Sequence, residues 1–379
     1  MRSFFPEESA APSTSVLTEA AQRARAHVRA HTPAHTRARR DVIALRQIAG
    51  LGDVGVARLL SVHGDATRAL MSVATERREQ AWREADRILA DLQRIGGDAL
   101  VAGSDRYPAR VLELSDAPPV LYAQGTLASA HPPAVAIVGT RAASAYGLRV
   151  ARAIATACAR AGVTIVSGLA RGIDGAAHEA ALAAGGRTVA VLGTGLDVHY
   201  PRSHRTLQER IARDGLLLTE QKPGDTGHGG TFPRRNRIIA ALADITVVVE
   251  AGKGSGALIT ADHALELNRT VACVPNAIDQ ASSLGSNALL KMHAEPILAV
   301  DDVLALLRID RSVSTHVALD GDAARCWDAL QQGARDIDQV AAAARLRPRE
   351  AAAVLSALEI DGLVHFGPSG QVHPSVSVS

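Results

Sequence analysis

The chain lacks long apolar segments and is poor in cysteine. None of its 379 residues lies in a run that approaches the ~18 apolar residues of a membrane span, and residues 1–11 contain no apolar signal core. The three cysteines, Cys158, Cys273 and Cys326, are too few and too widely spaced for a disulfide framework or a structural zinc site. We therefore expect a cytoplasmic protein with free thiols and no membrane contact.

Net charge is nearly absent as well. The 41 basic residues face 39 acidic ones, so nucleic-acid binding has to be argued from local clusters and not from the charge of the whole chain. The only lysines are Lys222, Lys253 and Lys291, a scarcity that genomic base composition explains more readily than selection for arginine chemistry. The length allows two or three domains, each with a hydrophobic core.

Composition divides the part of the chain before residue 321 into four segments. Residues 1–40 are rich in arginine, lack apolar periodicity and predict a disordered tail, with a nucleic-acid-binding arm as the alternative. Residues 41–100 predict a helical domain whose hairpin Gly50-Leu51-Gly52 resembles a helix-hairpin-helix (SAM-like) unit, a pattern found in DNA-binding and in inert packing units alike. Residues 101–305 predict a Rossmann-like core with a Pro-rich lead-in, and residues 306–320 a linker.

Residues 321–379 predict a winged-helix domain. Short helices are expected over residues 324–330, 337–344 and 348–358, and a β-ribbon follows. The third helix of such a domain often reads DNA. Here that helix carries Arg349 beside Glu350 and Glu359, so a protein contact or weak binding is favoured over DNA recognition.

Six β-branched segments predict the strands of the core. They do not alternate strictly between apolar and polar residues, and helical stretches separate them, which is typical of parallel strands buried on both faces. The segments are residues 135–138, 163–167, 188–192, 216–219, 245–250 and 271–274. The predicted fold class is therefore α/β, an extended Rossmann-like parallel sheet with an N-terminal helical domain and a C-terminal winged-helix domain.

The first two of these strands both end in a glycine turn that carries an arginine. Gly139-Thr140-Arg141 follows one strand and Gly168-Leu169-Ala170-Arg171 follows the next. Glycine lets the backbone approach a phosphate, helix N-terminal amides point at the anion, and arginine offers a planar charged fork. Since ligands of such sheets bind at the carboxyl ends of the strands, the turns predict a phosphate site. Arg234, Arg235 and Arg237 are expected to crowd a further helix N-terminus that favours phosphate.

Six ordered motifs resemble those of the DNA-processing protein A family (DprA, also called Smf). They are residues 136–141 with Ser144 and Tyr146-Gly147, residues 166–174 with Ala177-His178, residues 193–197 with Tyr200-Pro201, residues 232–239, residues 248–251 and residues 255–261. The resemblance implies a protein that binds single-stranded DNA without catalysing a reaction and without a cofactor. It also implies a homodimer that protects incoming DNA during natural transformation and helps to load the RecA recombinase.

The resemblance further implies which residues bind the DNA. Arg141 and Arg171 would contact phosphates, and the other residues of the site would be Gly139, Thr140, Ser167, Gly168, Arg234, Asn236, Arg237, Lys253, Ser255 and Gly256. Binding should depend on charge, with little sequence preference. The family dimerises through the carboxyl-terminal side of the core, which here includes the apolar residues 259–267 and 288–290.

The chain departs from the family pattern at several positions near that dimer surface. Gly254 stands where the family commonly has a basic residue, and Lys253 lies one place earlier. Asn268, Asn276 and His293 replace customary glycines, and Thr219 replaces a customary serine. Because asparagine tolerates positive φ better than most residues, the turns at the two asparagines should survive.

Three sets of residues have catalytic or metal-binding alternatives. Asp174 and His178 lie four apart and could pair in catalysis, but a helix N-cap and a buried, hydrogen-bonded histidine explain them more simply. The histidines at 199, 204 and 228 fit no compact metal site, so no metal is expected. Glu250 could act as a base, although a carboxylate bonded to glycine-loop amides explains it equally well.

Two other classes of function remain open. The core also resembles lysine-decarboxylase-like phosphoribohydrolases, which cleave nucleoside monophosphates, but their Pro-Gly-Gly-x-Gly-Thr loop is replaced by residues 252–256 after Glu250. A nucleotide-sensing adaptor, in which the core binds a free nucleotide and the end domains transmit the signal, is the second class. A dinucleotide dehydrogenase is disfavoured because Gly-x-Gly-x-x-Gly is missing after the first core strand.

Overall fold

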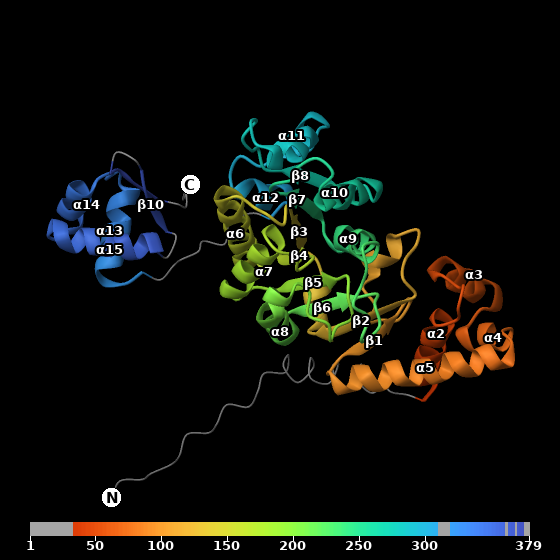
Figure 1. The fold of residues 1–379 in the computed structure, drawn as a ribbon. Helices are drawn as coiled ribbons and strands as arrows, with labels where there is room; N and C mark the ends of the chain where they lie inside the picture. The colour runs from red at the N-terminus through yellow and green to blue at the C-terminus, as the bar shows by residue number, and fades with distance from the viewer. Residues whose placement is uncertain (1–32, 310–318, 361–362, 368–369, 375–379) are drawn as a thin grey trace, which may run out of the picture. The chain divides into compact units, whose positions relative to one another are not determined.

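The computed structural model describes residues 33–309, 319–360, 363–367 and 370–374, which belong to two compact units (Figure 1). The first unit ends at residue 310 and the second begins at residue 311. Residues 1–32 of the predicted tail lie outside the described residues. Residues 33–40 of that predicted tail instead begin helix α2 (Pro33–Arg46), where Arg39 pairs with Asp98 and Arg40 with Asp86, each at 2.5 Å.

A nine-stranded sheet forms the centre of the first unit, in the order β1-β2-β6-β5-β4-β3-β7-β8-β9. The strands are β1 (Asp98–Val101), β2 (Val120–Gly125), β3 (Ala134–Val138), β4 (Thr164–Ser167), β5 (Thr188–Leu192), β6 (Leu216–Thr219), β7 (Ile245–Val248), β8 (Thr270–Cys273) and β9 (Glu295–Pro296). Strands β3 to β9 run parallel, whereas β1 and β2 extend the sheet antiparallel at the β6 edge. The predicted α/β fold class is confirmed, and all the predicted core strands are present.

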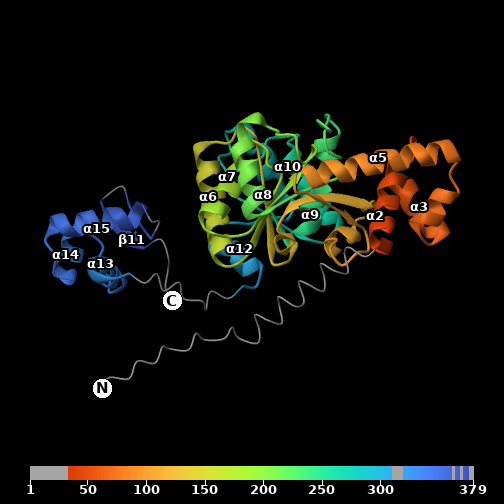
Figure 2. The same ribbon diagram turned by 90° about the horizontal axis from the view of Figure 1, so that it is seen from below.

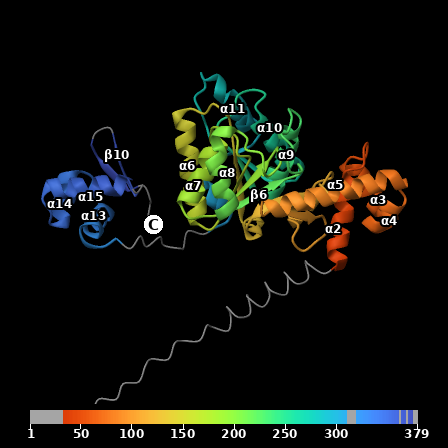
Figure 3. The same ribbon diagram turned by 60° about the horizontal axis from the view of Figure 1, so that its bottom comes forward.

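Helices cover both faces of this sheet (Figures 1 and 3). On one face lie α6 (Ala145–Arg160), α7 (Ile173–Ala183), α8 (Arg205–Asp214) and α12 (Asp301–Leu306), and on the other lie α9 (Thr231–Leu242), α10 (Gly256–Glu266) and α11 (Leu284–Lys291). Val135 and Ile137 of β3 pack towards α6 and α7, while Ala136 and Val138 pack towards α9 and α10. Every residue of β3 is therefore buried, which explains the unbroken apolar run.

The N-terminal helices lie at the β1 and β2 edge of the sheet. They are α2, α3 (Asp53–His63), α4 (Ala66–Met71) and α5 (Thr75–Arg94), and α5 leads directly into β1 (Figure 2). Leu45, Leu70 and Leu92 of these helices share one hydrophobic cluster with Tyr122 and Leu217 of the sheet. The predicted helical segment and the Rossmann-like core therefore pack as one unit.

The second unit is a winged-helix domain, as its sequence predicts. Helices α13 (Gly321–Gln331), α14 (Ile337–Ala344) and α15 (Pro348–Ile360) precede a ribbon of antiparallel β10 (Val364–Phe366) and β11 (Val372–Pro374). Leu330, Val340, Leu355 and Val372 lie in its separate core. Within the described ranges of both units, no helix combines the length and hydropathy that crossing a bilayer requires.

Two of the three substituted glycine positions adopt the left-handed backbone that glycine favours. Asn268, after α10, has φ 54°, and His293, after α11, has φ 68°. Asn276 does not take positive φ. Its side-chain amide instead donates to Val249 O at 2.7 Å and Val274 O at 2.8 Å, which ties the segment after β8 to β7.

Candidate nucleic-acid interface

The two arginine turns meet at the carboxyl ends of β3 and β4. Ile173 N donates to Thr140 O at 3.3 Å, and Thr140 N donates to Glu250 O at 2.7 Å. A Cβ at Gly139 would lie 2.5 Å from Ile173 Cγ1, and a Cβ at Gly172, whose φ is 78°, would clash with Thr140 O. Both turns therefore need glycine for this close approach. The exposed Arg141 and Arg171 project from the resulting edge.

Buried charges hold the second turn in place. Asp174 accepts from Gly168 N at 3.1 Å and from Ala170 N at 3.3 Å, and Arg235 donates to Gly168 O at 2.7 Å and to Val191 O. Burial raises the pKa of Asp174. Burial also lowers the pKa of Arg235 to about 10, opposed by the charge of Asp174 and assisted by that of Arg141. Asp174 thus fixes the turn from inside α7, whose N-cap residue is Gly172 and not Asp174.

His178 is a buried structural residue in this arrangement. Its Nδ1 lies 2.7 Å from Thr188 Oγ1, and that hydroxyl already donates to Ile165 O at 2.9 Å. Nδ1 must therefore carry the proton and donate it to Thr188. Burial lowers the pKa of His178 to about 3, so the ring is neutral at physiological pH. Asp174 and His178 thus have separate partners, in keeping with the structural interpretation.

A pocket opens beside the two turns. Its walls include Arg141 and Gly168 from the turns, Thr194 and Tyr200 from the loop after β5, and Phe232 from α9. The rings of Tyr200 and Phe232 have their centroids 4.8 Å apart with planes tilted by 39°. An exposed charge and an aromatic surface therefore border the same small pocket, of about 10 Å³, and these are the two kinds of group that bind the phosphates and bases of a strand.

The sequence interpretation did not include these two aromatic residues in the site. Both belong to the quoted motifs, as Tyr200-Pro201 and Phe232-Pro233, and the whole chain has only four tyrosines and four phenylalanines. A scarce aromatic residue beside the glycine-ended strands is the signal that could have identified them. A Cβ at Gly193 would lie 2.6 Å from the Phe232 ring, so the glycine after β5 also shapes this wall.

Glu250 has a different set of partners from the one predicted. Its Oε2 accepts from Ser144 N at 3.0 Å and from Ser144 Oγ at 2.8 Å, while Gly147 N donates to the same hydroxyl at 3.0 Å. Ser144 is the N-cap of α6. The carboxylate therefore fixes the start of α6. The expected partners of Glu250, the amides of the glycine loop at residues 252–256, are replaced by the amide and hydroxyl of Ser144.

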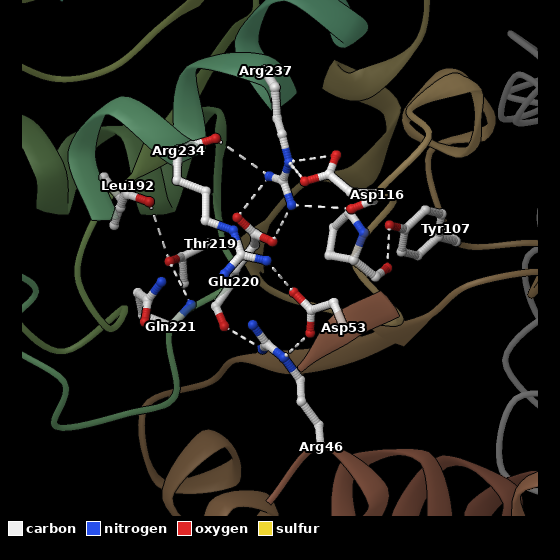
Figure 4. A network of polar contacts seen from close by, with 11 residues as sticks. Arg46, Asp53, Tyr107, Asp116, Leu192, Thr219, Glu220, Gln221, Arg234 and Arg237 are labelled. Carbon is white, nitrogen blue, oxygen red and sulfur yellow. Dashed lines mark hydrogen bonds and ion pairs between the residues drawn. The ribbon is translucent and has the colours of Figure 1, made fainter. Parts of the chain in front are cut away.

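Two of the three arginines of α9, Arg235 and Arg237, are buried, and Figure 4 shows the partners of Arg237. Arg237 is 3% exposed, and its guanidinium binds Glu220 at 2.7 and 2.8 Å and Asp116 at 2.8 and 2.9 Å. Further bonds to Asp116 O and Arg234 O engage the remaining N–H groups. The expectation that Arg237 offers donors to a phosphate needs correction, because carboxylates and carbonyls occupy them all.

Arg234 is the exposed member of this arginine cluster, and it is paired. Its Nη2 lies 2.7 Å from Asp53 Oδ2, and Arg46 Nε lies 3.0 Å from Asp53 Oδ1 (Figure 4). Asp53 begins α3, and Arg46 also donates to Glu220 O. The network therefore joins the N-terminal helices to α9, the helix that carries Phe232. Arg235 is buried below the second turn, so the three arginines do not form one phosphate-facing group.

The other predicted residues divide between interior and surface. Ser167 Oγ donates to Ile137 O at 2.7 Å and is buried, and Asn236 Nδ2 donates to Gly256 O at 2.9 Å. Ser255 caps α10, with Lys253 exposed just before it. Ser167 and Asn236 thus have protein partners in the interior, whereas Lys253 is accessible to a ligand. In the part of the chain that the structure describes, no group of His, Cys, Asp or Glu side chains could hold a metal ion.

Comparison with known proteins relates most of this chain to one family. The family model for DNA recombination-mediator protein A matches residues 98–308, and the DprA winged helix domain model matches residues 312–370. The putative DNA processing protein DprA of Mycobacterium tuberculosis is 39% identical over 315 residues, covering 75% of this chain and 79% of that protein. The Streptococcus pneumoniae protein DprA is 43% identical over 201 residues, covering 53% and 71%.

Two solved structures of such proteins share the fold. DNA processing protein A from Streptococcus pneumoniae superposes with a TM-score of 0.63 at 34% identity, covering 70% of this chain and 97% of that one. The corresponding protein from Helicobacter pylori, described for its single-stranded DNA binding mode, gives a TM-score of 0.51 at 31% identity and covers 56% and 95%.

Proposed function

Because this chain belongs to the DNA recombination-mediator protein A (DprA) family, we propose that it binds single-stranded DNA along the sheet edge that carries the two arginine turns and the small pocket beside them. The observation that carries the proposal is the presence of an exposed arginine and an aromatic pair on one pocket. Phosphates would lie against Arg141 and Arg171, and a base would stack on Tyr200 or Phe232. Every base has a π-face, so binding would tolerate any sequence. The Helicobacter pylori relative, described as binding single-stranded DNA, supports this substrate.

The predicted contact residues have two roles in this proposal. The turn residues Gly139, Thr140 and Gly168 would bring the protein backbone close to the DNA strand. The exposed Lys253 and the α10 N-terminus at Ser255 and Gly256 would extend the DNA contact along the edge of the sheet. Arg234 would attract the DNA through its charge while its guanidinium stays paired with Asp53. Ser167, Asn236 and Arg237 serve as scaffold, a role supported by their burial and protein partners.

Anisotropy titration of a labelled oligo-dT strand tests the contact, with unlabelled strand, duplex and mononucleotides as competitors. Arg141→Ala and Arg171→Ala should each weaken binding and lower the magnitude of the log–log salt slope by roughly 0.7, since each removes one phosphate contact. Arg160→Ala is the matched control, because Arg160 is an exposed arginine at the far end of α6. Unchanged affinity and slope in both pocket variants would remove the proposed site, and preference for a mononucleotide would favour the nucleotide-sensing adaptor.

The same proposal includes binding without catalysis. Asp174, His178 and Glu250 are all buried, and each is bonded to backbone or hydroxyl groups of the fold. Nucleoside monophosphates and single-stranded DNA should therefore remain intact after incubation with the protein. Base release that disappears in a Glu250→Gln variant would establish the phosphoribohydrolase alternative instead.

The biological setting of the proposal rests on family membership. It comprises protection of incoming DNA during natural transformation, help in loading the RecA recombinase, and a cytoplasmic location that suits three free buried cysteines. It also comprises a homodimer, supported by the exposed apolar side chains of Ile259, Leu265, Leu284 and Met292 on and beside α10 and α11. Sedimentation that detects only monomer at tens of micromolar, with and without DNA, would contradict the dimer.

A further inference from the structure

A second exposed aromatic ring lies near the first arginine turn. Among the phenylalanine, tryptophan and tyrosine side chains that the structure describes, only Tyr146 and Tyr200 are exposed, at 41% and 46%. Tyr200 borders the pocket together with Arg141. Tyr146 lies in the first turn of α6, the helix that follows Arg141 in the chain. The proposed DNA contact uses Tyr200 but gives Tyr146 no role.

The order of the strands places Tyr146 across Arg141 from the pocket. The pocket includes Gly168 and Thr194, which follow β4 and β5. Tyr146 Oη donates to Pro275 O at 3.3 Å, and Pro275 follows β8. Arg141 follows β3, which lies between β4 and β7 in the sheet. The ends of β5 and β8 are four strand spacings apart, which at ~4.8 Å each is roughly 19 Å.

An arginine with an available charge accompanies this ring. The guanidinium of Arg149, one turn further along α6, lies over the Tyr146 ring, with Cζ 5.6 Å from the ring centroid. Arg149 is exposed and forms no ion pair with the residues that the structure describes, whereas carboxylates occupy the buried Arg237. The ring and the guanidinium therefore offer one nucleotide a stacking surface and a positive charge.

We propose that Tyr146 and Arg149 form a second nucleotide subsite for single-stranded DNA, an inference that rests on the proposed binding along the arginine turns. A base would stack on the exposed ring, and the adjoining phosphate would lie against Arg149. Lys253, in the loop after β7, would contact phosphates between the two subsites. At the ~3.4 Å spacing of a stacked strand, the distance between the subsites corresponds to about six nucleotides.

Anisotropy titration with oligo-dT strands of increasing length, from about two to about twelve nucleotides, tests the inference. Wild-type affinity should rise until the strand spans both subsites. Tyr146→Leu should bind the longest strand about tenfold more weakly, because one stacked base is lost, and its affinity should stop rising at a shorter length. Its log–log salt slope should stay unchanged, whereas Arg149→Ala should lower the magnitude of the slope by roughly 0.7.

Two control variants separate this subsite from a structural role of the tyrosine. Tyr146→Phe keeps the ring but loses the bond to Pro275 O, so it should bind like the wild type. Arg160→Ala removes an exposed arginine from the far end of the same helix and should also bind like the wild type. An equal loss in Tyr146→Phe and Tyr146→Leu would assign the tyrosine to the fold and overturn the subsite.

The variants of the arginine turns distinguish failure of this inference from failure of the proposed function. If Arg141→Ala weakens binding while Tyr146→Leu and Arg149→Ala keep wild-type affinity and length dependence, the second subsite is refuted and the proposed function stands. If Arg141→Ala and Arg171→Ala also keep wild-type affinity, the proposed function is refuted, and the second subsite with it.

Discussion

Replacement of Arg237 by methionine should cost stability and leave DNA binding intact. Glu220 is 3% exposed, and both of its carboxylate oxygens bind Arg237, at 2.7 and 2.8 Å. The variant would leave this carboxylate buried without its counter-charge, which costs about 3–5 kcal/mol. The second partner adds little, because the Asp116 side chain is 39% exposed and water can replace the arginine there, a loss of about 0–1 kcal/mol.

Thermal unfolding measures this cost. For a unit of this size, 3–5 kcal/mol corresponds to a fall in Tm of roughly 5–9 °C. The double variant Arg237→Met with Glu220→Gln should recover a large part of that loss, because a neutral amide beside a thioether leaves no buried charge. Oligo-dT affinity, measured well below the Tm, should stay within about twofold of wild type, because Arg237 is buried and does not contact the DNA in the proposed site.

Two results would refute this reasoning. If Arg237→Met loses oligo-dT affinity as Arg141→Ala is expected to and keeps its Tm, then Arg237 is a DNA contact and the ion pair with Glu220 is not maintained in solution. If the double variant is no more stable than the single variant, then the unpaired charge of Glu220 is not the source of the loss.

Three further predictions concern the wall, the interior and the turn of the site. Phe232→Leu should weaken oligo-dT binding about tenfold and, unlike Arg141→Ala, leave the salt slope unchanged; a reduced slope would argue against stacking. The pKa of about 3 for His178 lies below the ordinary value of about 6.5, so stability should fall as pH drops below 6.5, by about 2 kcal/mol at pH 5. Urea unfolding of His178→Gln should show a free energy of unfolding that depends less on pH than that of the wild type. Parallel curves for the two proteins would show that His178 does not cause the loss of stability at low pH. Gly172→Ala should destabilise more than Gly185→Ala, because both positions have positive φ but only at Gly172 would the added Cβ clash with Thr140 O; equal urea midpoints would contradict this.

The parallel core could be predicted from the sequence because its signal is local. Strands β3 to β8 are short runs rich in valine, isoleucine and leucine that helices cover on both faces, so each run is largely apolar by itself. Strand β1 (Asp98–Val101) escaped prediction, since it follows directly on the long helix α5 and lies at the edge of the sheet. Its pairing with β2, and that of β2 with β6, depends on contacts between distant parts of the chain.

The position of the candidate site could be predicted for the same reason, but the orientation of its arginines could not. A glycine turn after a buried strand is visible in the sequence, and the structure brings the turns at Arg141 and Arg171 together through the bond between Ile173 N and Thr140 O. In α9, Arg234 and Arg237 stand three apart, on neighbouring faces of the helix. Arg234 is nevertheless exposed and Arg237 buried. The sequence could not show this difference, because the partners of Arg237 are 17 and 121 residues away along the chain.

Motif membership thus locates the site without separating the residues that contact a ligand from those that shape it. Arg235 and Asn236 belong to the same motif as Phe232, yet their polar groups bind Gly168 O, Val191 O and Gly256 O, and these bonds hold α9 against the turns. The ring of Phe232, in contrast, contacts the ring of Tyr200 and lines the pocket. The side chains with unused binding capacity at this edge therefore include the arginines of the turns and the aromatic pair, and a nucleic-acid strand uses both kinds of group.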